Sequence, residues 1–292
     1  MKRKLTMDGI EYRDLLKLLN EEIYKYARRN GIDLNDEKKL IQYCNAMKKI
    51  ELGKETTEIL LDGIMQYDVG DQRVLKFINL EGISFAGRCV RRVDFRGTNA
   101  DVDPQTVEDK NIEGANFEEI DMSDKCFDGC VICHANLSYT NANINPQNVY
   151  RKDLEQTKCD GLDLSQSDFT DVYVQRASFK NAKINLDPQK VRGKCLEWTN
   201  LENVDMSGKD FNGCELMGCN LTNSHAVLDL RYLDATRLWG CKLKGTTLLV
   251  GEDFDREQLE KQCVELGQVS LDEHTLTKQK IKSIFKTINN TD

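Results

Sequence analysis

Between residues 73 and 250 the chain repeats every five residues, and this period restricts its fold more than any other feature. From residue 115 to residue 139, each unit of five carries a large apolar residue in its third place. These residues are Phe117, Met122, Phe127, Ile132 and Leu137. The second place is often Asp or Asn, and the 3.6-residue period of a helix is absent. The pattern predicts a solenoid, in which each repeat buries its apolar residue against neighbouring repeats.

The five-residue units resemble those of the pentapeptide-repeat family, which read A(D/N)LXX. The resemblance covers about 180 of the 292 residues. Long arrays of short repeats are typical of solenoid proteins. It implies a mainly β fold, a right-handed quadrilateral β-helix in which four units make one coil. It also implies that the large third residues point into the core.

A longer, 42-residue period lies on top of the short one. It links Pro104, Pro146 and Pro188. It also links four phenylalanines that we expect to form the structural core, Phe85, Phe127, Phe169 and Phe211. Eight units of five residues make two coils, so each 42-residue step contains two residues more than the units account for. Because proline cannot donate to a sheet ladder, we expect the extra pair to bulge at the Pro–Gln positions.

The Pro–Gln bulges are the candidate interaction loops of this chain, because loops on a rigid scaffold commonly carry function. Their residues are Pro104, Gln105, Pro146, Gln147, Pro188 and Gln189. We expect the loops to lie on one side of the solenoid, in every second coil. The alternative is that they are tolerated bulges, pinned by Val107, Val149 and Val191. The sequence leaves both interpretations open.

Helical patterns flank the repeats. Residues 1–72 contain apolar stripes at helical spacing, which predict a helical N-terminal domain or cap. Residues 251–292 contain two further stripes, one through Leu259 and Cys263 and one through Ile281 and Ile284, which predict C-terminal helices. An open β-helix end exposes unpaired strand edges, so at least one flank should cover an end. The other flank is available for a partner or for a homodimer.

The eleven cysteines are expected to be reduced and largely structural. Four of them occupy the small inward place of a unit, where a thiol behaves as a slightly larger alanine. These are Cys130, Cys214, Cys219 and Cys241. Five lysines fall where a small inward residue is expected, namely Lys110, Lys125, Lys152, Lys194 and Lys209. Since a buried unpaired ammonium is costly, these corners should be irregular or should let the side chain out.

The sequence Cys130-Val131-Ile132-Cys133-His134 matches the attachment motif of c-type haem, and Cys126 precedes it. The repeat argues against this chemistry: Cys130 should face inward, while Cys133 and His134 follow it outward around a corner, so the groups should diverge. The chain's histidines, His134, His225 and His274, have no spacing that suggests a catalytic triad. We therefore predict no metal, no cofactor and no enzymatic activity.

Charge narrows the class of partner. The net charge is −8 for the chain and −4 for residues 73–250, without a basic stretch, which argues against direct nucleic-acid binding. Asp121, Asp163 and Asp205 recur at one outward place. They could mimic DNA phosphates or bind a cation, but satisfying local backbone groups is the favoured interpretation.

The sequence thus predicts a non-catalytic protein–protein interaction module with an unknown protein partner. The alternative, which the resemblance implies, is a DNA-mimic protein that binds a type II topoisomerase such as gyrase. No apolar run reaches the length of a membrane span, and no secretory signal is recognised. A cytoplasmic location is expected, in the producing cell or in one to which the protein is delivered.

Overall fold

The fold was analysed in a computed structural model, which describes residues 80–233, 235–250, 256–263 and 268–271. The described residues belong to two compact units. The first contains residues 80–144 and 148–151, and the second contains residues 145–147 and the described residues from 152 onward. The helical domain predicted for residues 1–72 lies outside the described residues.

The chain turns every five residues, so the sequence period corresponds to a period of turns. In the first coil of the first unit, an amide N–H donates to the carbonyl three residues earlier at Ile83, Arg88, Val93 and Thr98. The third residue of each turn has a positive φ, as at Gly87 (67°) and Arg92 (60°). Turns of this kind need that conformation, which glycine adopts without steric cost. The large apolar residue that begins each turn is buried, as at Leu80 and Phe85.

Successive coils pair as parallel strands, and a short step alternates with a long one. Along one side of the second unit, isolated bridges join Lys158 to Ser178 over a short step, Ser178 to Asn200 over a long step and Asn200 to Asn220 over a short step. The first unit shows the same alternation, from Asp94 to Asn116 to Asn136. One short and one long step together equal the superperiod of the sequence. The repeats therefore form a β-helix-type solenoid.

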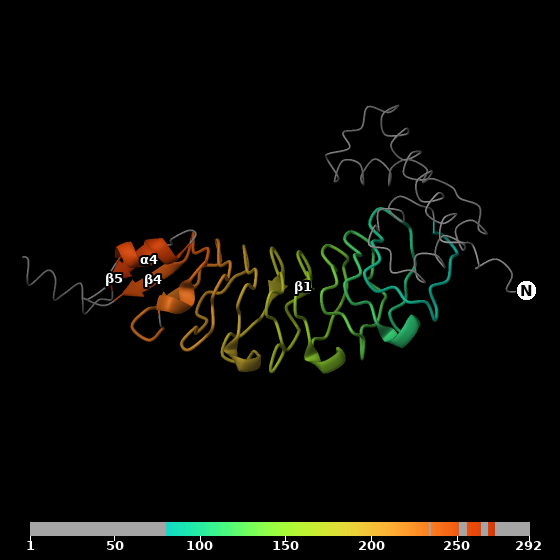
Figure 1. Ribbon diagram of the computed structural model, residues 1–292, viewed down its shortest axis with the longest axis horizontal. Helices are drawn as coiled ribbons and strands as arrows, with labels where there is room; N and C mark the ends of the chain where they lie inside the picture. The colour runs from blue at the N-terminus through green and yellow to red at the C-terminus, as the bar shows by residue number, and fades with distance from the viewer. Residues whose placement is uncertain (1–79, 234, 251–255, 264–267, 272–292) are drawn as a thin grey trace, which may run out of the picture. The chain divides into compact units, whose positions relative to one another are not determined.

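Regular elements are short. The 3₁₀ helices are η2 (Glu108–Lys110), η3 (Tyr150–Lys152), η4 (Arg192–Lys194) and η5 (Ala235–Leu238). The strands are β1 (Asp163–Leu164), β2 (Lys183–Ile184), β3 (Val227–Asp229), β4 (Thr247–Val250) and β5 (Gln268–Leu271), and the α-helix is α4 (Arg256–Gln262). Strands β1 and β2 pair in parallel, as do β3, β4 and β5. Figure 1 shows β4 and β5 together with α4.

The region predicted to form C-terminal helices contains both a helix and a strand. Helix α4 buries Leu259, and the Cys263 thiol after it lies 3.5 Å from the Leu238 carbonyl. Strand β5 then pairs with β4, so the parallel stack continues beyond residue 250. The stripe through Ile281 and Ile284 lies outside the described residues. No helix among the described residues is long and apolar enough to span a bilayer.

The four core phenylalanines are all buried, with at most 3% of each residue exposed. Their closest ring contacts are not with one another, because a valine occupies the same place in the intervening coil. In the second unit Val191 lies one coil after Phe169 and one coil before Phe211. The Phe169 ring instead meets Phe179 edge-on, at 5.7 Å between ring centroids. In the first unit Phe95 contacts Phe85 edge-on and stacks on Phe117.

The inward lysines reach solvent rather than remaining in the core. Lys125 leaves 14% of its side chain exposed, and its ammonium lies 2.6 Å from an Asp101 carboxylate oxygen. The hydrogen bond to Asp101 raises the pKa of Lys125. Lys209 donates to the side-chain oxygen of Asn185 at 2.8 Å. The remaining three follow the loops: Lys110 and Lys194 are exposed and Lys152 is half-buried.

Candidate functional site

The Pro–Gln loops point their side chains toward the scaffold. Pro104, Pro146 and Pro188 are buried, and the glutamine after each is half-buried. Gln189 Nε2 donates to the carbonyls of Asp210 and Asn212 in the next coil, at 3.1 and 2.8 Å. Equivalent pairs of bonds join Gln105 to the Cys126 and Asp128 carbonyls, and Gln147 to the Asp168 and Thr170 carbonyls. Each glutamine thus fastens its loop to the following coil.

A side-chain acceptor shapes each loop. The amide N–H of Gln189 donates to Asp187 Oδ1 at 3.0 Å, and the Gln105 amide donates to Asp103 Oδ1 at 2.9 Å. These Asx turns fix the chain direction at the proline. One 42-residue step after Gln189, the sequence has Arg231 in place of a glutamine, and Arg231 pairs with Asp229 at 2.6 Å. The contacts support the interpretation that these loops are pinned bulges, while recognition by their outer residues stays a prediction.

Replacing Gln189 with alanine should destabilise the second unit by about 1 to 2 kcal/mol, because two hydrogen bonds at the rim of a coil are lost where water can partly replace them. Chemical denaturation monitored by circular dichroism measures this change. Gln166→Ala is the matched control, since Gln166 is exposed. Equal stability of the two variants would show that the glutamine does not fasten the loop.

The recurring aspartates are engaged in turns. Asp163 Oδ1 accepts the amide and hydroxyl of Ser165, at 3.2 and 2.7 Å, and Asp205 accepts those of Ser207, at 3.0 and 2.6 Å. Asp121 accepts the Ser123 amide at 3.1 Å. Hydrogen bonds from these serines hold the pKa of each carboxyl below its ordinary value. Local backbone satisfaction therefore accounts for this ladder of carboxylates.

A polar hollow of about 430 Å³ lies in the second unit between residues 165–170 and the loop that carries Asp187. Lys190 and Lys209 line it, but both have partners: Lys190 lies 3.8 Å from the Asp187 carboxylate, and Lys209 binds Asn185. The wall of the hollow carries equal numbers of positively and negatively charged side chains. The hollow is a solvated depression rather than a shaped ligand site.

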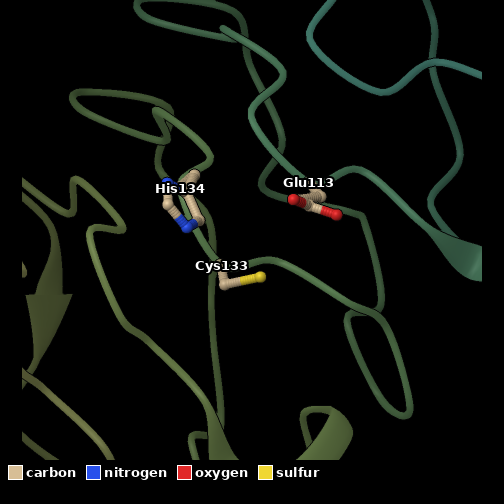
Figure 2. A group of neighbouring side chains, drawn as sticks. All are labelled: Glu113, Cys133 and His134. Atoms are coloured by element: carbon tan, nitrogen blue, oxygen red, sulfur yellow. The ribbon is translucent and has the colours of Figure 1, made fainter.

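The Cys-His segment differs from its prediction. Cys130 is buried, as expected, and its thiol points toward the Pro104 carbonyl at 3.6 Å. Cys133 and His134, however, converge with Glu113 of the preceding coil at one corner (Figure 2). One carboxylate oxygen, the thiol sulfur and one imidazole nitrogen all lie within 4.8 Å of one another. The expected divergence is therefore wrong for Cys133 and His134.

A second group that sequence reasoning missed is an aromatic face formed by the chain's two tryptophans. Trp198 and Trp239 pack edge-to-face at 6.3 Å between ring centroids, and 43% and 54% of these residues is exposed. The backbone sets their spacing, because the Trp198 amide donates to Met217 and the Gly218 amide donates to Trp239. The two indoles thus belong to coils on either side of the coil that carries Gly218.

Gly218 makes room for the aromatic face. A methyl group on its Cα would overlap the Trp198 ring, and its φ is 68°. The rim of the face is polar: Gln175 donates to Glu197 at 2.5 Å, and Arg237 pairs with Glu215 at 2.6 Å. An apolar centre with a paired, polar rim has the composition of a protein-binding surface.

Comparison with known proteins identifies the repeat. The family model described as pentapeptide repeats matches the chain in eight copies, over residues 153–185 and 195–226. No curated protein matches the chain. The matched residues lie in the second unit and include the coil that carries Trp198.

Proposed function

Because this chain is a pentapeptide-repeat protein, we propose that it is a non-catalytic interaction module, and that its Trp198–Trp239 face binds a partner protein. The observation that supports this proposal is the exposure of two large indoles on a scaffold whose coils are joined by backbone hydrogen bonds. Tryptophan is enriched among residues that dominate binding energy, and rigid placement lowers the entropy cost of association.

Loss of either indole should weaken partner binding by roughly 30-fold or more, the effect of removing a residue worth about 2 kcal/mol. The measurement is quantitative cross-linking capture with the full chain, followed by an affinity measurement with the captured protein. Trp198→Ala and Trp239→Ala should both lose the partner. Tyr232→Ala, at an exposed aromatic residue outside the aromatic face, should keep it.

A second pair of variants separates the aromatic face from the backbone. Gly218→Ala leaves both tryptophans in the sequence but forces the Trp198 ring to move. Gly213→Ala places a side chain at a similar positive φ, 73°, with nothing within 4 Å. We expect Gly218→Ala to lose the partner and Gly213→Ala to keep it. Unchanged capture by all three face variants would refute the proposal.

The finer architecture belongs to the same proposal. The coils are four-sided and right-handed, as in the family, and the turns at five-residue steps support four sides. The segments that flank the repeats, residues 1–72 and 251–292, are the proposed homodimer contact. The proposed location is a reducing one such as the cytoplasm, in which cysteines buried in the core, such as Cys214 and Cys219, stay reduced.

The alternative function is a DNA mimic that binds a type II topoisomerase. It is supported by the family resemblance and by the acidic excess over residues 73–250. A gyrase supercoiling assay distinguishes it, because a mimic should inhibit or protect the enzyme at micromolar concentration. A lack of effect removes this alternative and leaves the aromatic face proposal to its own test.

A further inference from the structure

We propose that Glu113, Cys133 and His134 bind one divalent zinc-like metal ion at a corner of the first unit. Among the residues that the structure describes, this is the one cluster that brings together three potential metal ligands. Figure 2 shows Glu113 on one coil and Cys133 and His134 on the next, with the three side chains at the same corner. The site is independent of the aromatic face, which lies in the second unit.

The scaffold places Glu113 beside Cys133. The two residues occupy the same place in successive coils, and the pairing of Asn111 with Val131 holds those coils in register. On either side of Glu113, the Ile112 amide donates to Val131 at 3.0 Å and the Gly114 amide donates to Cys133 at 3.1 Å. Neighbouring strands lie about 4.8 Å apart, so two side chains at one place can share an ion.

The turn brings His134 to the same corner. In an extended strand, adjacent side chains point to opposite faces, which would separate His134 from Cys133. His134 has a φ of 63°, so the chain is turning at this residue and the alternation is broken. The imidazole consequently joins the thiol and the carboxylate. Because His134 is exposed and the other two residues are half-buried, an ion can reach all three from solvent.

The donor set selects a borderline metal. Calcium and magnesium prefer oxygen ligands throughout, whereas one sulfur, one nitrogen and one oxygen suit Zn²⁺. Bonds of about 2.0 to 2.3 Å around a tetrahedral ion place ligand atoms about 3.3 to 3.8 Å apart. Atoms that lie within 4.8 Å of one another need small side-chain rotations to close around the ion. Water supplies the fourth ligand.

Metal binding at this corner has a structural consequence. The ion joins two successive coils at their outer edge, in addition to the backbone bonds between them. Because binding to the folded state stabilises it by mass action, zinc should raise the thermal midpoint of the first unit. The thiol loses its proton when the metal binds, so affinity should rise with pH.

Cobalt spectroscopy tests the site in the untagged, full-length protein, kept reduced with a phosphine. Co²⁺ should bind with a stoichiometry of one and give a thiolate-to-cobalt charge-transfer band, and added Zn²⁺ should displace it. Cys133→Ser should abolish the band. Glu113→Gln and His134→Asn should weaken Co²⁺ binding at least about 10- to 100-fold, the loss that follows removal of even an outer-shell partner.

Two matched controls separate this site from other thiols and imidazoles. Cys126→Ser removes an exposed cysteine that precedes the same segment. His225→Asn changes an exposed histidine that also has a positive φ, 55°. Both controls should bind Co²⁺ as the parent protein does, and circular dichroism of every variant verifies the fold. Absence of a charge-transfer band in the parent protein, or its persistence in Cys133→Ser, would overturn the proposal.

Discussion

Replacement of Phe169 by alanine is expected to lower the free energy of unfolding by about 3 to 5 kcal/mol, the cost of truncating a buried phenylalanine. The Phe169 residue is 3% exposed, and its ring packs edge-on against the fully buried Phe179. Removing it leaves a cavity and an aromatic partner without its contact. Because a coil buries its apolar side chains only against neighbouring coils, the loss should spread beyond the substituted one.

Chemical denaturation of the purified protein measures the effect of Phe169→Ala. Phe169→Leu is the conservative variant and should cost less, because it keeps most of the volume. Tyr232→Ala is the surface control, since Tyr232 is 69% exposed. A shift in the thermal midpoint of less than about one or two degrees would contradict the core register, given that about 1 kcal/mol usually moves the midpoint by several degrees.

In the folded protein, Cys214 and Cys241 are expected to be alkylated about three orders of magnitude more slowly than an exposed cysteine, because few of their thiols are ionised. Burial raises the pKa of both thiols to about 12, from an ordinary value of 9.0. The thiolate is the reactive form, and each unit of pKa lowers its population tenfold below the pKa. The Cys241 thiol also lies 2.9 Å from the Leu216 carbonyl, in position to donate its proton.

Iodoacetamide labelling near neutral pH, with and without denaturant, measures this protection by peptide mass spectrometry. Cys126 is exposed and serves as the internal reference. Because the folded pKa is raised, the stability contributed by the buried thiols is present below pH 9 and is lost as the pH rises toward 12. Labelling of Cys241 in the folded protein at the rate of Cys126 would show that the thiol is not in the core.

Much of the solenoid could be predicted because the repeat pattern itself indicates which residues are buried. The five-residue spacing assigns each large apolar residue to one turn, and this assignment depends only on residues close together in the sequence. The alternation of short and long coils is likewise contained in the 42-residue spacing of Pro104, Pro146 and Pro188. Polar residues at inward places, such as Lys125, were harder to interpret, because their outcome depends on a partner in another coil, Asp101.

The candidate sites were missed for a related reason. Glu113 lies a full coil before Cys133 in the sequence, and Trp198 lies two coils before Trp239. A search for chemical groups at steps of one coil would have found the first pair. The sequence did not predict that the Gln189 side chain points toward the scaffold, because its acceptors are backbone carbonyls, which every residue type supplies.

The five-residue period was enough to predict that the chain winds into stacked coils and which side chains fill them, because the spacing of one large apolar residue per turn can be read from neighbouring residues in the sequence. Tertiary structure alone decided which outward side chains meet. Glu113 with Cys133 and His134, and Trp198 with Trp239, become neighbours only when coils stack in register. That register is set by hydrogen bonds between coils and by the width of each turn, neither of which depends on the outward residues that it brings together.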